Sequence, residues 1–478
     1  MHFDSLDYIL FLTLSVAAYW AARAHPLWRL GSLFIASCAF YMAWHPLYIV
    51  LILGSTVLDF SMGLRIARAR SQRAKKAYLL ASVVGNLGLL GMFKYFNFAA
   101  RVAVDGLELL GYSLRAPYLD VLLPVGISFY TFQTLSYTID VYRGRLNATS
   151  NPIEFAVFVT YFPQLVAGPI VRAAEMLPQL RQFPKLTRRQ SSEGLFLIAT
   201  GLIKKVAIAD YLSINLVDRI FDNPAGYTAV EVVVGLYGFT MQMYCDFSGY
   251  TDVARGSAKL MGLELPDNFD RPYQATNPAD FWRRWHQTLS SWLRDYLYVP
   301  LGGSRCGPVR AYFSLALTMF LIGIWHGASW TFVYYALLQA TAMVLHRFVR
   351  RRSRRSRNDA VHPAAVNVTM IAAKIFANLQ FVVFSRILFR ATDLQNAVDV
   401  TERLWSGQTS TAQITPAVWF VLLLSFALHY TPKRWFERLE REFVWQSPAF
   451  QALGLVVVGC ILSLVASAQV VPYIYFQF

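Results

Sequence analysis

Long blocks of apolar residues constrain this chain more than any other feature of its sequence. A helix needs about 20 predominantly apolar residues to cross the hydrocarbon layer of a bilayer, whereas the strands of a soluble core are much shorter. Blocks near this length recur along the 478 residues, of which 56% are hydrophobic and only 15% charged. We therefore expect an all-α polytopic membrane protein with ten or more crossings, at residues 8–22, 78–93, 155–171, 195–212, 230–244, 311–324, 330–345, 366–388, 418–428 and 453–471.

The positive charge of the chain lies in short loops between these blocks. The formal net charge is +16. Nucleic-acid-binding proteins gather such charge on one soluble face, whereas membrane proteins keep it in cytoplasmic loops beside anionic lipid. The sequence thus favours membrane lipid over nucleic acid as a partner, with cytoplasmic clusters at residues 65–76, 347–357, 433–441 and, more weakly, 185–189.

The last basic cluster sets the predicted orientation of the chain. From residues 433–441 in the cytoplasm, the apolar block 453–471 leads outward, so the aromatic tail 472–478 is expected to be extracytoplasmic. Counting from the cytoplasmic cluster at 347–357, block 366–388 leads outward and block 418–428 leads back, which again places residues 433–441 in the cytoplasm. This agreement supports the orientation.

Two other common features are not expected. The chain starts with Asp4 and Asp7 instead of a basic stretch, which argues against a cleaved secretory signal. The four cysteines have no paired spacing, so they predict neither a disulfide framework nor a metal site; they are Cys38, Cys245, Cys306 and Cys460.

The stretch from Asn268 to Pro308 is too polar for a lipid-exposed helix. Such backbone is tolerated at membrane depth only where protein buries it or where it lines a water-filled cavity. We expect a single membrane domain over residues 1–478, with a re-entrant or interfacial element at 265–310 on the cytoplasmic side.

His326 is the most suggestive of the eight histidines. It follows an apolar helix that begins near Arg310, and sixteen residues of helix span about 24 Å of a hydrocarbon layer about 30 Å thick. An ionisable group at such depth is costly and is by default a candidate functional residue. Gly323 and Gly327 would let a substrate or a neighbouring helix approach. The structural alternative is a neutral histidine that hydrogen-bonds two helices together.

His286 lies in a segment where tryptophan and arginine alternate. This pattern is common where a helix is anchored at the membrane interface. Alternatively, Arg283, Arg284 and Arg294, with Trp285 between them, could bind the phosphates of a cytoplasmic acyl donor, because guanidinium groups match phosphate in a bidentate fashion.

A set of ordered motifs covering nearly the whole chain resembles the membrane-bound O-acyltransferase (MBOAT) family, and within it the membrane subunits of bacterial alginate O-acetyltransferases. The matching segments are residues 123–130, 139–144, 162–169, 246–250, 268–273, 281–303 and 322–327. The resemblance implies a ring of about 11 or more transmembrane helices around a central tunnel, in a bacterial inner membrane. It makes His326, within the helices of residues 311–346, the catalytic histidine and His286 a second important one.

The tail resembles a C-terminal aromatic motif of related acyl-export proteins, in which a tyrosine is thought to accept the acyl group. Tyr475 takes that position, and Tyr473 replaces the first phenylalanine of the motif. The alternative is an aromatic anchor at the outer interface. Asp246 and Asp295 are candidates either for orienting a histidine or arginine or for structural ion pairs.

These residues lead to one mechanistic hypothesis. Acetyl-CoA would bind from the cytoplasm as a substrate, with no tightly bound cofactor, and His326 would act as general base toward the hydroxyl of Tyr475. An SGNH-hydrolase-like partner outside would then pass the acetyl group to a polysaccharide. The alternatives are D-alanyl or other acyl transfer from a carrier protein to a cell-wall polymer, and a non-covalent transporter or flippase.

Overall fold

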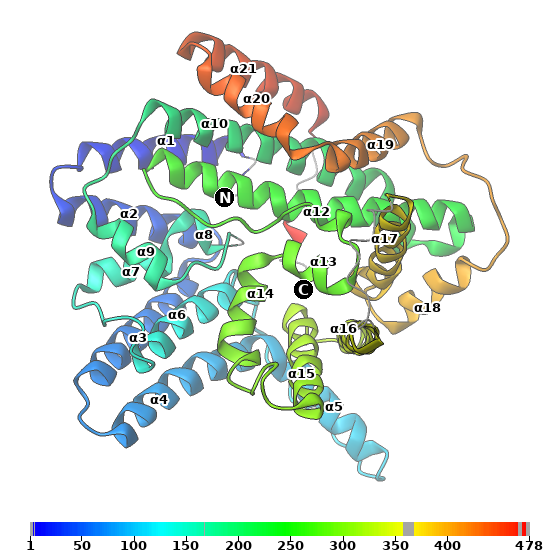
Figure 1. Cartoon of the computed structure of the whole chain (residues 1–478), viewed down its shortest axis with the longest axis horizontal. Coiled ribbons are helices and arrows are strands. Elements are labelled where there is room, and N and C mark those ends of the chain that lie inside the picture. The colour runs from blue at the N-terminus through cyan, green and yellow to red at the C-terminus, as the bar shows by residue number, and fades with distance from the viewer. Residues whose placement is uncertain (1–2, 4, 167, 357–367, 467–470, 475–478) are drawn as a thin grey trace. The chain divides into compact units, whose positions relative to one another are not determined.

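The computed structural model describes the chain except for residues 1–2, 4, 167, 357–367, 467–470 and 475–478. Within this described part the chain forms helices and turns and no β-strand, as the predicted all-α class requires (Figure 1). The helices fall into two compact units. The first unit comprises residues 1–198 and 251–266, and the second comprises residues 199–250 and 267–478.

Six helical stretches of the described chain are long and apolar enough to cross a bilayer. They are Pro46–Arg68, Gln72–Glu108, Pro308–His326, Trp330–Ser353, Val368–Arg390 and Pro448–Val465. Two shorter apolar helices, α1 (Leu6–Ala21) and α19 (Pro416–Tyr430), add to them. The predicted total of about 11 crossings, the central tunnel and the single membrane domain stay predictions.

The apolar block at residues 155–171 is not one helix, contrary to the sequence prediction. Helix α7 (Pro152–Thr160) ends there and the short α8 (Phe162–Leu165) follows. The break falls at Tyr161, whose ψ of 108° is not helical, and Pro163 has no N–H with which to continue the hydrogen bonds of α7. The side-chain amide of Gln164 donates to the carbonyl of Phe158 at 2.9 Å, so a group left over by the break is satisfied internally.

In the first unit, three helices pack against one another: α3 (Ile49–Arg68), α4 (Gln72–Leu90) and α6 (Ile127–Tyr142) (Figure 1). The predicted apolar blocks did not include α3 and α6. Helix α6 carries polar residues along its length, whereas α3 was missed although it is more apolar than α15. Asp59 of α3 is fully buried and accepts hydrogen bonds from Ser82 at 2.5 Å and Asn86 at 2.8 Å, so the polar groups face one another. Helix α2 (Pro26–Met42) was missed as well.

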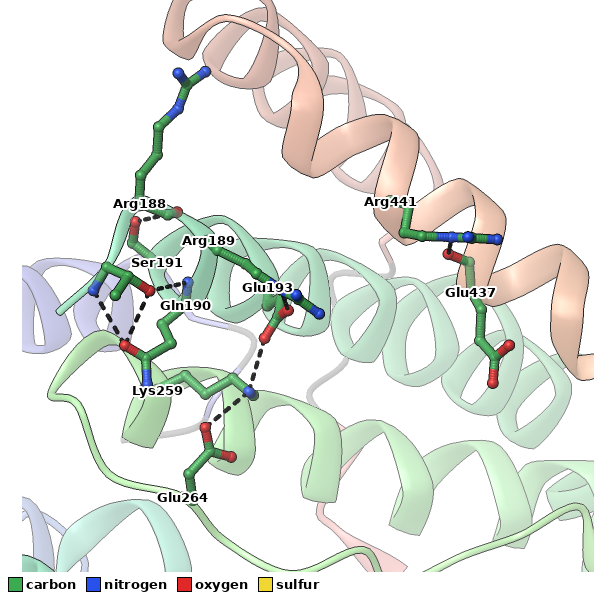
Figure 2. A network of polar contacts seen from close by, with 10 residues as sticks. Arg188, Arg189, Gln190, Ser191, Glu193, Lys259, Glu264, Glu437 and Arg441 are labelled. Atoms are coloured by element: carbon green, nitrogen blue, oxygen red, sulfur yellow. Dashed lines mark hydrogen bonds and ion pairs between the residues drawn. The ribbon is translucent and has the colours of Figure 1, made fainter.

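A charged network joins α10 (Arg188–Leu202) to the end of α12 (Ala229–Leu260) in the first unit (Figure 2). Lys259 pairs with Glu193 at 3.0 Å and with Glu264 at 3.1 Å, and Arg189 pairs with Glu193 at 2.7 Å. Partial burial acts to raise the pKa of Glu193, but Arg189 and Lys259 outweigh it and hold that pKa below its usual range.

The second unit is built around the pair α15 (Pro308–His326) and α16 (Trp330–Ser356), with α17 (Val368–Arg390) packed on α16 (Figure 1). A Cβ atom on Gly323 would collide with Ala336 of α16, and one on Gly327 would collide with the ring of Phe332. The two glycines therefore allow a neighbouring helix to approach, which is one of the two roles expected from the sequence.

The polar stretch predicted as re-entrant or interfacial forms only short helices. They are η6 (Pro272–Gln274), α13 (Pro278–Arg284), α14 (Gln287–Leu293) and η7 (Arg294–Tyr298). None of them is long enough to span a bilayer, and all four carry residues of the candidate site or border it. Their depth in the membrane stays a prediction.

Candidate active site

His326 is the last residue of α15 and is buried, with 3% of its surface exposed. Its ring lies 5.0 Å from that of Phe389 on α17 and 5.0 Å from that of Trp325. The rings of Phe332 and Tyr335, both on α16, are 6.4 and 6.5 Å away. Three helices thus place this imidazole within an aromatic shell.

His286 is fully buried and adopts a left-handed backbone conformation, with φ of 43°, just before α14. Its Nδ1 lies 3.0 Å from the side-chain oxygen of Asn268, which also accepts hydrogen bonds from the backbone and hydroxyl of Thr288 at 3.3 and 3.0 Å. A carboxamide oxygen only accepts, so Nδ1 carries the proton and Nε2 is the basic nitrogen. Burial lowers the pKa of His286 to about 3, so the ring is neutral near pH 7.

The structure brings the two predicted histidines into one cluster. The indole of Trp325 lies 6.1 Å from the ring of His286 and 5.0 Å from that of His326. Phe247 of α12 contacts His286 from another side, with 4.7 Å between ring centroids. Residues far apart in the sequence therefore enclose both imidazoles.

Arg386 of α17 is a site residue that the sequence reasoning missed. It is 2% exposed, and its guanidinium carbon lies 5.0 Å from the ring of Trp285 and 5.5 Å from that of Phe389. Its Nε and one terminal nitrogen have no hydrogen-bond acceptor among the described residues. The signal was present in the sequence, because a charged residue inside a predicted crossing is by default a functional candidate.

The predicted donor-binding residues separate in the structure. Arg283 and Arg284 both pair with Asp280, at 3.0 and 3.2 Å, and Arg294 pairs with Asp295 at 2.7 Å. Trp285 is buried in the aromatic cluster rather than exposed to a donor. Asp295 therefore contacts an arginine, which agrees with both of its predicted roles.

Only Arg283 of these four residues lines a basic cavity of about 940 Å³ between the start of α15 and the end of α16. His346, Arg347, Arg350 and Arg351 of α16 also line this cavity, and Arg347 donates to the hydroxyl of Tyr298 at 2.5 Å. The sequence reasoning counted these α16 residues as a cytoplasmic loop cluster or as a membrane edge. Their spacing of three to four residues, which places them on one helix face, was the available signal.

The cavity and His326 both lie along α15. Leu315 of α15 lines the cavity, and eleven residues of helix separate it from His326, a distance of about 16 Å along the axis. A ligand with a charged end in the cavity and a reactive group at His326 would follow this helix.

Comparison with known proteins decides the family. The family model described as MBOAT, membrane-bound O-acyltransferase family, matches residues 143–385, which include both histidines. The chain is 39% identical to the probable alginate O-acetylase AlgI of Pseudomonas aeruginosa over 383 residues, 79% of this chain and 70% of that protein. The chain belongs to the membrane-bound O-acyltransferase family.

Other MBOAT relatives differ in the acyl group or acceptor that their names give. The peptidoglycan O-acetyltransferase of Helicobacter pylori is 34% identical over 82% of this chain and 77% of its own length. The teichoic acid D-alanyltransferase of Bacillus subtilis is 28% identical over 48% of this chain and 60% of its own length. Family membership and the apolar helices make this protein a multi-pass membrane O-acyltransferase.

The tail of this MBOAT chain is described up to Ile474, so Tyr475 lies outside the described residues. Tyr473 is buried, and its ring lies 5.8 Å from that of Phe247, which also contacts His286. Asp246 pairs with Lys205 at 2.9 Å, which agrees with its predicted ion-pair role.

Proposed function

We propose that this O-acyltransferase takes an acetyl group from cytoplasmic acetyl-CoA and passes it, through the tail tyrosine Tyr475 and an SGNH-hydrolase-like partner, to an extracytoplasmic polysaccharide. The relatives named as alginate O-acetylase and peptidoglycan O-acetyltransferase support acetyl as the group and a polysaccharide as the acceptor. The observation that carries the proposal is a buried imidazole, His326, near a second buried histidine, His286, and a buried arginine, Arg386.

His326 has the chemistry that such a transfer requires. Its neutral imidazole takes the proton of the acceptor hydroxyl while the hydroxyl oxygen forms a bond to the thioester carbonyl carbon. The carbon–sulfur bond then breaks, and the imidazolium returns the proton to the departing CoA thiolate. The products are an acetyl ester and free CoA thiol, and His326 is neutral again.

Arg386 and His286 have supporting roles in this proposal. The negative charge that develops on the carbonyl oxygen needs donors already in place, and such donors are worth most where water is excluded. The guanidinium of Arg386 is buried and has donors left over among the described contacts. His286, held by Asn268, remains a neutral hydrogen-bonding group beside the same cluster.

The basic cavity fits the phosphates of the donor. Arginine binds phosphate in a bidentate fashion, and five basic residues line this one space. Arg283 is retained from the predicted donor site because it lines the cavity, whereas Arg284 and Arg294 do not. The positive-inside rule favours a cytoplasmic position for the arginines at the end of α16 in a bacterial inner membrane, which agrees with an extracytoplasmic tail.

The test uses the purified full chain and acetyl-CoA labelled in its acetyl group. We expect His326→Ala to lower the release of CoA thiol by about 10²- to 10⁴-fold, the usual contribution of a general base, without changing elution on gel filtration. His25→Ala, a change at an exposed histidine, is the matched control. Undiminished thiol release by His326→Ala would remove the catalytic role.

The alternative donor is a carrier protein bearing D-alanine, because one relative is named a teichoic acid D-alanyltransferase. Turnover of acetyl-CoA by the purified chain alone distinguishes the two donors. The non-covalent transporter is no longer an alternative, since the chain belongs to a family of O-acyltransferases.

A further inference from the structure

Three charged residues lie buried together in the second unit. The ammonium group of Lys205 is 2.7 Å from Asp210 and 2.9 Å from Asp246, and the three side chains are 12%, 13% and 4% exposed. Taking charges out of water is costly, and the cost is recovered only where further hydrogen bonds satisfy the remaining donors and acceptors. One cation and two carboxylates leave a surplus negative charge that calls for additional donors.

The backbone of the tail satisfies part of this need. The amide of Ile474 donates to the second carboxylate oxygen of Asp246 at 2.8 Å, and Lys205 donates to the carbonyl of Val471 at 3.2 Å. Both contacts are made to main-chain atoms, so they recognise the course of the tail rather than its side chains. Two anchors three residues apart also fix its direction.

Aromatic residues of the motif at 246–250 hold the same segment. The ring of Tyr473 lies 4.9 Å from that of Tyr250 and 5.8 Å from that of Phe247. Tyr473 and Ile474 are both 2% exposed. Three of the five motif residues therefore contact the tail: Asp246 binds its backbone, and Phe247 and Tyr250 cover a tail side chain.

The residues that hold the tail lie next to the histidine cluster. Phe247 lies between Tyr473 and His286, whose ring is 4.7 Å from its own. Tyr475 is the residue after Ile474, and one residue extends the chain by at most about 3.6 Å. The described contacts thus hold the residue that immediately precedes Tyr475 in the sequence.

We infer that Lys205, Asp246, Phe247 and Tyr250 form a seat for the chain's own tail, and that this seat positions Tyr475 for acylation. The second clause rests on the proposed function, whereas the seat itself does not. Lys205 and Asp246 are positioning residues: they act through the tail backbone, and their loss should release the tail without altering the histidines.

Hydrogen exchange of the full-length protein, read by mass spectrometry on a peptide containing residues 471–474, tests the seat directly. We expect Asp246→Asn and Lys205→Met to speed exchange of the Ile474 amide at least tenfold. Asp218→Asn is the matched control, because it breaks another ion pair of the second unit, Asp218 with Arg390 at 2.6 Å. Unchanged exchange in both variants would overturn the seat.

Substitutions in the tail itself control for misfolding of the Asp246→Asn and Lys205→Met variants. Tyr473→Ala removes the ring that packs on Phe247 and Tyr250, whereas Tyr473→Phe keeps it. We expect faster exchange at Ile474 in the first variant only, with exchange in α15 unchanged in both. Equal protection in the two variants would contradict the aromatic part of the seat.

Incubation with labelled acetyl-CoA tests whether Tyr475 is acylated, independently of whether the seat binds the tail. If Tyr475 accepts the acetyl group, its label should fall at least tenfold in Asp246→Asn and persist in Asp218→Asn. An active wild-type protein whose Tyr475 carries no label would overturn the relay and the positioning clause, even where the exchange data uphold the seat. A labelled Tyr475 in a fully exchanging Asp246→Asn variant would overturn the positioning clause alone.

Discussion

Arg386 stacks over the ring of Phe389, three residues further along α17, with 5.5 Å between its guanidinium carbon and the ring centroid. The ring of His326 also lies next to that of Phe389, 5.0 Å away. One phenyl ring thus contacts both the fixed positive charge of the site and the imidazole proposed as its base. This arrangement suggests that the cation acts on the reaction.

Replacing Arg386 with methionine should separate activity from stability. We expect acetyl transfer to fall roughly 10²-fold, the usual effect of losing one donor to a developing oxyanion. Stability should be kept or raised, because a buried charge is exchanged for an apolar side chain of similar length. Thiol release and the thermal unfolding midpoint measure the two effects, and Arg386→Lys, which keeps the charge, should lose less activity. Wild-type turnover in Arg386→Met would refute this role.

The depressed pKa of His286 predicts that stability falls in acid. The unfolded imidazole takes up a proton near pH 6.5, whereas the folded one does so only near pH 3. The stabilisation is therefore complete above pH 6.5 and is lost as the pH falls toward 3, amounting to on the order of 2 kcal/mol at pH 5. Unfolding midpoints of wild type and His286→Gln should converge as the pH is lowered from 7.5 to 5. Parallel pH profiles of the two proteins would argue against a buried neutral histidine.

The basic cavity should govern donor binding and not the chemical step. Arg347→Gln combined with Arg350→Gln should raise the KM for acetyl-CoA at least tenfold with little change in kcat, because a charged contact made equally in ground and transition states affects binding alone. Steady-state kinetics at several salt concentrations should also show a weaker salt dependence. Arg438→Gln changes a surface arginine that is 77% exposed and serves as the control. A fall in kcat at constant KM would point to another role.

Close packing of α15 on α16 makes Gly323 sensitive to a single added methyl group. A Cβ there would meet Ala336, so Gly323→Ala should destabilise the protein by about 1–3 kcal/mol. Gly454 of α21 (Pro448–Val465) has no neighbour within 4 Å of such a Cβ. Gly454→Ala should be neutral or stabilising, because alanine favours helix over glycine by up to about 1 kcal/mol. Thermal unfolding of the two variants should shift in opposite directions or by clearly different amounts.

The sequence predicted the helices whose composition is uniform and missed those with buried polar groups. An apolar run ending in His326 predicts α15, and its glycines predict a close neighbour. Helix α3 was missed although it is more apolar than α15, and its one carboxylate, Asp59, is satisfied by Ser82 and Asn86 from α4, a contact that a sequence window does not contain. Pro163 was visible in the block at 155–171, but its effect on helix continuity was not weighed against the apolar composition.

The candidate site was predicted residue by residue, but its assembly was not. His286 and His326 came from motifs, whereas the ring of Trp325 between them follows from packing. The arginines were predicted by residue type alone. In the structure Arg283 pairs with Asp280 and lines the cavity, whereas Arg284 and Arg294 pair with carboxylates and do not line it. Spacing along a chain does not show which charges a fold has already neutralised.

Helix α12 runs without interruption for 32 residues, a length of about 48 Å. A hydrocarbon layer about 30 Å thick would contain all of it only at a tilt of about 50°, beyond the 0–40° that membrane helices adopt. At least one end of this rod must therefore project past the lipid tails. The charged end at Lys259, with its partners Glu193 and Glu264, suits such a projection into headgroups or water, so the edge of the membrane need not coincide with the end of a helix in this protein.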